Sequence, residues 1–426
     1  MAAVPEPSLV LSFEEARHLV ENHAAHLRPR GKELVELLEG AGQILAEPVL
    51  ADRNFPPFPR AMRDGYAVRA ADLSQVPATL EVIGEIKAGA RSEDIPTLQP
   101  GQAAGIMTGA PAPSGSDAVV MVEHTSRDAG RVQIMKPVAA GANIVAIASE
   151  AKRGQRLLSP GMRLDFAAVA VAASVGRSRI LVYSKPKVAI LATGDEIVDI
   201  DVPPAANQIR NSNSYSLAAQ VQAAGGEPVL LPVAPDETAR LRELIADGLE
   251  SDLLLLSGGV SMGKYDLVEP VLAEFQAEFL FTGAQIQPGK PAVFGRVPCG
   301  GGRFAREELA SPPAHVYFFG LPGNPVSTMV TFELFARPVL EALAGMTARK
   351  LVFLSARLKS EIRTKTGLKR FLPAILSGEF EQAEVELAGW HGSGDVAAMA
   401  RANCYLVIPP DRERIAEGEW VPVLMR

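Results

Sequence analysis

The chain has 426 residues, of which 47% are hydrophobic and 21% are charged. At about 100–200 residues per domain, this length predicts two to four domains, and the composition excludes an intrinsically disordered chain. The formal net charge is −7, whereas a general binder of the phosphate backbone of nucleic acids normally carries a basic excess. We therefore expect no nucleic-acid partner.

The chain offers no signal for export or membrane insertion. Its two cysteines, Cys299 and Cys404, cannot build a disulfide framework or a zinc cluster. The first twenty residues lack the basic segment and the apolar core of a secretory signal. The most apolar stretch, 164–176, is too short to span a bilayer. We expect a cytoplasmic protein without membrane contact.

The first 180 residues alternate between helical and β-like patterns. A capping box at Ser12–Glu15 precedes apolar residues at helical spacing, and a second helical pattern follows around Glu33–Leu38. Short β-like runs divided by Gly and Pro fill residues 80–136 and predict a small β domain. The small apolar residues of 160–176 predict another helix.

Strands and helices alternate after Lys185, which predicts a parallel α/β sheet. The expected strands are 188–193, 252–259 and 316–325. A helix at 212–226 starts with serine and asparagine and stops at glycines, and a long apolar helix runs to about Leu343. Short β runs return after Gly345. Ligands of such sheets bind at the carboxyl ends of the strands, where three polar, glycine-bearing loops occur here.

The first of these loops is 193–196, with the sequence Thr-Gly-Asp-Glu. Its two adjacent carboxylates, Asp195 and Glu196, are hard oxygen ligands that suit Mg²⁺ beside phosphate. On these four residues alone a helix N-cap is the favoured interpretation, because Asp prefers that position.

The second loop, 257–266, matches two motifs that point to other chemistry. Residues 258–264 match the P-loop pattern, but Tyr265 stands where a P-loop needs Ser or Thr for Mg²⁺. Ser261 lies in a G-x-S-x-G pattern, which predicts a serine hydrolase with His315 or His391 as the base. No HGGG-type oxyanion motif precedes it.

An anion site is the third interpretation of this loop. Gly258 and Gly259 let backbone N–H groups approach an anion, a following helix start adds positive potential, and Asp266 is a candidate metal ligand. A simple tight turn is the alternative without function.

The third loop, 320–327, contains two prolines, Gly323 and Asn324, and it places Ser327 in the first turn of a helix. It could also be a plain connector. Before it, the turn 287–291 presents Lys290 as a point-charge partner for phosphate or an oxyanion, although a lone lysine is usually just solvated.

Two more loops carry candidate residues. Asp64 follows a proline-rich segment in Arg-Asp-Gly-Tyr, where Asp-Gly usually marks only a turn. Ser393 lies in the polar loop 391–395 and could bind an anion, although a hairpin loop is the default expectation.

Together these segments resemble the molybdopterin molybdenumtransferase family, which includes the bacterial MoeA enzymes, the plant molybdenum insertase domain and the gephyrin E domain. The resemblance runs from about residue 8 to the end of the chain. It rests on the segments 55–68, 107–123, 190–198, 209–215, 256–266, 288–295, 320–327, 392–395 and 402–409.

The resemblance implies the fold class, a multidomain chain of α/β and β parts with a central parallel α/β molybdopterin-binding subdomain. The expected domains are 8–50 with 145–182 as an elongated N-terminal part, 51–144 as an inserted β subdomain, 183–345 as the α/β subdomain and 346–426 as a C-terminal β-barrel-like subdomain. It also implies a homodimer whose active site lies between two chains.

The resemblance further implies the reaction. Such enzymes take adenylylated molybdopterin and molybdate, hydrolyse the adenylyl phosphoanhydride with Mg²⁺, and insert molybdenum into the dithiolene. AMP and molybdenum cofactor are released. An upstream adenylyltransferase and downstream molybdoenzymes are the implied protein partners.

The resemblance also implies roles for residues at positions that match the family pattern. The implied catalytic residues are Asp64, Glu196, Asp236, Asp266 and Lys290, with Asp64 acting on the partner chain's site. The implied metal ligands are Glu150, Glu196, Asp236 and Asp266. The implied substrate-binding residues are Thr193, Gly194, Asp195, Gly258, Gly259, Ser261, Pro291, Asn324, Ser327, Arg370 and Ser393.

The chain departs from the family pattern at two places. Gln287 replaces a usual lysine, and residues 145–147 lack the usual arginines, so the presumed site has fewer cations. These changes are compatible with a weaker substrate grip, a preference for tungstate, or a diverged paralogue. They also motivate a non-catalytic pterin-binding or scaffolding protein as an alternative to the enzyme.

Overall fold

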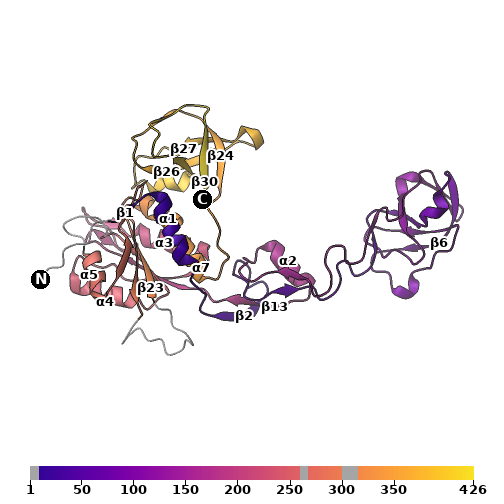
Figure 1. Ribbon diagram of the computed structural model, residues 1–426, viewed down its shortest axis with the longest axis horizontal. Coiled ribbons are helices and arrows are strands. Elements are labelled where there is room, and N and C mark those ends of the chain that lie inside the picture. The colour runs from indigo at the N-terminus through magenta and orange to yellow at the C-terminus, as the bar shows by residue number, and fades with distance from the viewer. Residues whose placement is uncertain (1–8, 260–266, 300–314) are drawn as a thin grey trace.

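The computed structural model describes residues 9–259, 267–299 and 315–426. The chain forms an elongated molecule (Figure 1). An α/β body and a β-barrel lie together at one end, a narrow arm with helix α2 extends from them, and a β-sheet lobe that contains strand β6 forms the other end.

The α/β body is built on a six-stranded sheet in the order β17-β14-β18-β23-β22-β19. The first four strands pair in parallel, whereas β22 runs antiparallel to both of its neighbours, β23 and β19. Their bounds are β17 Glu227–Leu230, β14 Lys187–Ala192, β18 Leu253–Ser257, β23 His315–Leu321, β22 Val293–Pro298 and β19 Glu278–Phe281. The predicted parallel α/β sheet is thus confirmed, with two antiparallel strands added at one edge.

Helices cover both faces of this sheet because the strand residues alternate between two cores. Val188 and Ile190 of β14 belong to the core under α3, α6 and α7, whereas Ala189 and Leu191 belong to the core under α4 and α5. The helix bounds are α3 Ser212–Ala224, α4 Thr238–Gly248, α5 Val268–Glu274, α6 Pro325–Thr331 and α7 Arg337–Leu343. A π-helical turn, Phe332–Ala336, joins α6 to α7.

The first helix, α1 (Phe13–Ala24), has the predicted capping box of Ser12 and Glu15. Its buried apolar residues belong to the core of the α/β body, and it packs against α7. Residues 8–50 therefore divide between two parts of the molecule. The helix joins the α/β body, and the strands that follow build the arm.

The arm pairs β2 (Lys32–Glu36) with β13 (Arg179–Tyr183) beside α2 (Phe166–Ser174). The helix predicted around Glu33–Leu38 is therefore wrong. Only one of the five β2 residues is even partly buried, so the segment carries no strong apolar period. Its hydrogen bonds to β13, a segment more than 140 positions later, decide the structure.

The far lobe and the barrel are both β structures. The far sheet has the order β8-β5-β7-β6-β10-β9. Its strands are Ala118–Met121, Gly65–Val68, Gln102–Ile106, Ala78–Ile86, Arg131–Ile134 and Thr125–Asp128. The barrel closes in the order β26-β27-β24-β30-β28 through a pairing of β26 with β28. Its strands are Lys369–Ser377, Glu384–Leu387, Phe353–Leu358, Trp420–Met425 and Cys404–Ile408.

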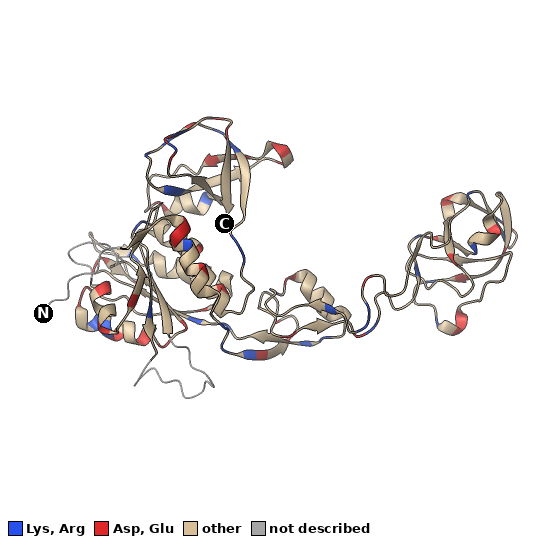
Figure 2. Cartoon of the chain, in the orientation of Figure 1, with Lys and Arg blue, Asp and Glu red and all other residues tan. Residues whose placement is uncertain are grey.

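The remaining elements are short. They are β1 Val10–Leu11, β3 Val49–Leu50, β4 Arg60–Ala61, β11 Ile144–Val145, β12 Arg156–Leu158, β15 Ile197–Val198, β16 Ile209–Arg210, β20 Gly283–Ala284, β21 Ile286–Gln287, β25 Ile362–Arg363, β29 Arg414–Ile415 and α8 Val396–Arg401. Acidic and basic residues are interspersed over all parts of the molecule in Figure 2. Within the described ranges, none of the helices has the length and apolarity needed to cross a bilayer.

Candidate functional site

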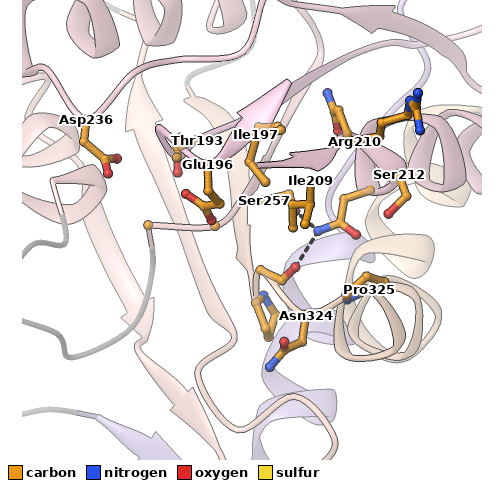
Figure 3. Close-up of a pocket in the computed structure, with 18 of the residues that line it drawn as sticks. Thr193, Glu196, Ile197, Ile209, Arg210, Ser212, Asp236, Ser257, Asn324 and Pro325 are labelled. Carbon is orange, nitrogen blue, oxygen red and sulfur yellow. Dashed lines mark hydrogen bonds between the residues drawn. The ribbon is translucent and has the colours of Figure 1, made fainter. Parts of the chain in front are cut away.

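A cavity of about 550 Å³ opens at the carboxyl ends of the parallel strands (Figure 3). Ala192, Ser257 and Leu321 are register partners on neighbouring strands, so the three predicted loops begin at the same level of the sheet. The cavity is lined by residues 192–194, 196–197, 209–213, 236, 257–259, 291 and 322–325. The structure thus brings together most of the candidate residues of the α/β body.

The first loop leaves β14 without starting a helix. Thr193 forms a bridge with Ala234, residues 195–196 make a turn, and the short strand β15 follows and pairs with β16. The N-cap interpretation of Asp195 is therefore wrong. A four-residue pattern cannot distinguish a cap from a turn, because Asp is favoured in both.

Acidic side chains gather at one side of the cavity. The backbone N–H of Asp236 donates to Oδ1 of Asp195 at 3.0 Å, and Glu196 and Asp236 both line the cavity. Partial burial raises the pKa of Asp236, and the charges of Asp195 and Glu196 raise it further. These carboxylates repel one another, so a bound cation would stabilise the arrangement.

The acidic side supplies carboxylate oxygens, which are hard ligands that suit a divalent cation such as Mg²⁺. In the described part of the chain, no three His, Cys, Asp or Glu side chains come together as ligands of one ion. Mg²⁺ is commonly held by one or two carboxylates together with substrate phosphates and waters. Glu196 and Asp236 match that donor set, and Asp266 lies outside the described residues.

The glycine turn after β18 requires its glycines. Gly258 and Gly259 have φ values of +91° and +62°. A Cβ on Gly258 would lie 2.7 Å from the carbonyl oxygen of Thr193, and one on Gly259 would lie 2.7 Å from Oγ1 of the same residue. The turn therefore presents backbone to the cavity. Ser261, on which the hydrolase interpretation depends, lies outside the described residues.

The third loop ends in α6, with Asn324 as the N-cap residue and Pro325 in the first turn. Asn324 lines the cavity, but Ser327 is buried inside α6 and does not. The carbonyl of Ser393 accepts a 2.9 Å hydrogen bond from the N–H of Val326. The loop 391–395 of the barrel therefore sits on the start of α6.

Asn213 holds these loops together, and sequence reasoning did not single it out. Its Nδ2 donates to Oγ of Ser257 at 2.8 Å and to the carbonyl of Gly323 at 2.7 Å (Figure 3). It belongs to the first turn of α3. The available signal was the polar segment 209–215, which includes the start of the predicted helix 212–226.

A second cavity of about 640 Å³ lies where the α/β body meets the barrel. Gln287 and Arg370 are register partners on β21 and β26, and both line this cavity with Trp390. Arg370 is only 6% exposed, and burial lowers its pKa. Lys290 is exposed on the turn that follows Gln287, and Pro291 lines the first cavity. The two cavities thus flank the turn 287–291.

Asp64 and Glu150 do not reach either cavity within one chain. Asp64 lies between β4 and β5, at the far lobe, where the N–H and the hydroxyl of Thr108 donate to its Oδ1 at 2.6 and 2.7 Å. These bonds lower the pKa of Asp64. Glu150 pairs with Arg60 of β4 at 2.7 Å. Neither acid lines the first or the second cavity.

Three family profiles match consecutive parts of the chain. "MoeA N-terminal region (domain I and II)" matches residues 11–176, "Probable molybdopterin binding domain" matches 189–342, and "MoeA C-terminal region (domain IV)" matches 355–425. All the described residues that line the first cavity lie within the second of these regions.

Relatives match the chain over nearly its whole length. The molybdopterin molybdenumtransferase of Nostoc sp. is 36% identical over 92% of this chain and 88% of its own, and that of Haemophilus influenzae is 32% identical over 93% and 94%. The crystal structure of a molybdopterin biosynthesis moeA protein from Pyrococcus horikoshii has a TM-score of 0.77 at 29% identity and covers 98% of this chain and 100% of its own. The chain therefore belongs to the molybdopterin molybdenumtransferase family of molybdenum cofactor biosynthesis.

Proposed function

We propose that this chain is a molybdenum insertase that hydrolyses adenylylated molybdopterin with Mg²⁺, inserts molybdate into the dithiolene, and releases AMP and molybdenum cofactor. The observation that carries the proposal is the cavity at the strand ends, which combines an acidic side with a glycine turn. An anionic, metal-bound diphosphate needs both features, because carboxylates hold the metal and backbone N–H groups bind phosphoryl oxygens.

In this proposal Glu196 and Asp236 hold Mg²⁺ at the diphosphate, together with Asp266. The ion supplies positive charge that lowers the cost of attack at phosphorus. The residues around it orient the ligand. Gly258 and Gly259 let the backbone approach a phosphoryl group, and Thr193 packs beneath that turn. Asn324 lines the wall at the start of α6.

Molybdate, the second substrate, is proposed to bind toward the second cavity. Arg370 is a buried cation there, and among the described residues its side chain donates only to the carbonyl of Leu368, at 3.1 Å. Lys290 and Pro291 lie on the turn between the cavities, and Ser393 belongs to the loop on the start of α6. Ser327 would act from within α6, where it is buried.

We propose a cytoplasmic homodimer in which Asp64 and Glu150 of one chain complete the site of the other. Their absence from the lining of both cavities of their own chain supports this arrangement. The helix α2 on the arm supports it as well. It contains no charged residue, and Phe166 is 90% exposed. An adenylyltransferase would supply the substrate, and molybdoenzymes would receive the product.

AMP release tests the proposal directly. Purified protein is incubated with adenylylated molybdopterin, Mg²⁺ and molybdate, and each ion is omitted in turn. We expect AMP release that requires Mg²⁺ and a molybdenum-containing pterin product that requires molybdate. Tight binding of the pterin with no AMP release under any condition would contradict the insertase.

That contradictory result would instead favour a pterin-binding scaffold. Gln287 is the observation behind this second candidate, because an uncharged side chain stands beside Arg370 where the family pattern has a lysine. The same assay separates the two functions, since a scaffold binds the ligand and leaves the phosphoanhydride intact.

A further inference from the structure

The lining of the first cavity is strongly uneven in charge. Of its described lining residues, only Glu196, Asp236 and Arg210 carry side chains that are charged at neutral pH. The two carboxylates lie on one side of the view in Figure 3, and Arg210 lies on the other. Lys290 does not line this cavity. An anionic ligand in the cavity therefore meets one cation of the described chain, Arg210.

Arg210 is held in place by a hydrogen bond from its Nε to a backbone carbonyl. It belongs to β16, which pairs with β15, and its Nε donates to the carbonyl of Ile200 at 3.0 Å. Among the described residues no carboxylate forms an ion pair with it, and both terminal nitrogens remain outside this hydrogen bond.

Other exposed arginines of the same body behave differently. Arg240 pairs with Glu243 at 2.8 Å, and Arg242 pairs with Glu274 at 2.6 Å. Each of these guanidinium groups has its counter-charge within the protein. Arg210 has an exposed side chain and lines a cavity instead, which makes it available to an anion that enters from solution.

We propose that Arg210 binds the adenylyl phosphoryl group of the substrate, opposite the acidic side that holds the metal. The inference rests on the proposed function and adds a substrate-binding residue to it. A guanidinium presents two parallel N–H donors to phosphoryl oxygens, and the bond from Nε to Ile200 fixes its plane before the ligand arrives. Arg210 and the metal then neutralise a diphosphate from its two sides.

Binding of AMP in the absence of metal tests this inference. AMP carries the phosphoryl group in question, and omitting Mg²⁺ removes any binding that a metal on Glu196 and Asp236 would mediate. We expect Arg210→Gln to weaken AMP binding by about 10- to 100-fold, measured by titration calorimetry, because a charge-assisted hydrogen-bonded pair is lost. Arg210→Lys should retain part of the affinity, since it keeps the positive charge but loses the pair of parallel N–H donors.

Arg240→Gln is the matched control, because it removes an exposed arginine of the same body that does not line the cavity. It should bind AMP as the wild type does, and all variants should show the wild-type thermal midpoint. Wild-type affinity in Arg210→Gln would overturn the inference. If the Arg210→Gln variant also still releases AMP from the substrate, the insertase proposal stands without Arg210. A wild-type protein that neither binds nor releases AMP would refute both the inference and the insertase proposal.

Discussion

Single residues of the cavity differ in what they contribute to stability and to binding. Asp236 is set against two other carboxylates, and Asn213 satisfies partners on two loops. A charge held next to like charges destabilises the free protein, whereas an amide nitrogen that donates two hydrogen bonds stabilises it. Substitutions of the two residues should therefore change the stability of the fold in opposite directions, and both should lower activity.

Asp236→Asn should stabilise the metal-free protein while stopping turnover. The pKa of Asp236 is raised in the folded state, so folding favours the protonated form, and its contribution to stability is lost as pH rises through the raised pKa. Removing the charge should raise the thermal midpoint at pH 7 by on the order of 1 °C, because the group is exposed and screened. The difference should vanish at pH values below the unfolded pKa.

Asp411→Asn is the control for that variant, because Asp411 is an exposed carboxylate on a barrel loop. It should leave both the thermal midpoint and AMP release unchanged. A thermal midpoint of Asp236→Asn below that of the wild type at pH 7 without metal would show that the carboxylate is stabilised by its surroundings.

Asn213→Ala tests whether the amide positions the cavity walls. The loss of two hydrogen bonds should cost about 1–3 kcal/mol of unfolding free energy. Asn403 offers a matched control, since its side chain makes two bonds with the backbone of Leu376 in the barrel, at 2.8 and 2.9 Å. Both alanine variants should lose comparable stability in urea, and only Asn213→Ala should lower kcat/KM, by roughly 10-fold or more. Equal kcat/KM in the two variants would reduce Asn213 to a structural residue.

At the scale of elements, the site depends on loops that leave the sheet at one level. The turn at Gly258 is the tightest of these, because its backbone lies against the carbonyl of Thr193. The helices α3 and α6 start beside it, and Asn213 joins their N-terminal loops. A change in this turn should therefore alter both stability and ligand binding.

Gly258→Ala should cost more than a left-handed backbone alone explains. The variant combines a φ of +91° with a Cβ 2.7 Å from a backbone oxygen. Gly42 has a φ of +81° but nothing within 4 Å of its Cβ, so Gly42→Ala measures the strain without the clash. We expect about 1 kcal/mol for Gly42→Ala and about 2–4 kcal/mol for Gly258→Ala in urea unfolding, with AMP binding lost only in the latter. Equal costs would mean that the turn relaxes freely.

Sequence patterns predicted the elements whose signals are local. The N-cap Asn211 and the stop at Gly225, which has a φ of +97°, define α3 as expected. The segment 33–38 and the loop 193–196 were assigned wrongly, because strand pairing with distant residues decides the first and a turn the second.

The candidate site shows the same limit of sequence reasoning. Glycine turns and acids at strand ends could be predicted, since parallel strands end at one edge. The linking role of Asn213 and the place of Arg210 in the cavity lining could not, because they depend on how the loops meet. Neither residue belongs to a motif that carries its own chemistry.

At the scale of the whole molecule, the elongated shape separates the far lobe from the cavity (Figure 1). Asp64 directly precedes β5 of the far lobe and accepts hydrogen bonds from Thr108, and its lowered pKa keeps it ionised. Such a carboxylate can serve a site only if another chain supplies that site. The shape of the monomer and the position of Asp64 therefore both support a dimer with shared sites.

Mixing two inactive variants tests the shared site. Asp64→Ala and Glu196→Ala should each stop AMP release. After both are unfolded, mixed and refolded together, heterodimers should regain one intact site of two, which gives roughly a quarter of wild-type activity in a random mixture. A chain that carries both substitutions is the control. In its mixture with wild type, each site of a heterodimer lacks one of the two residues, so only the wild-type dimers are active. Failure of the first mixture to recover activity would place both residues in one chain's site.

The position of the substrate is the central claim, and a crystal structure of the protein with adenylylated molybdopterin tests it most directly. The account predicts the diphosphate in the first cavity, between the carboxylates of Glu196 and Asp236 and the guanidinium of Arg210, over the turn at Gly258. A diphosphate bound in the second cavity beside Arg370, or outside both cavities, would contradict it.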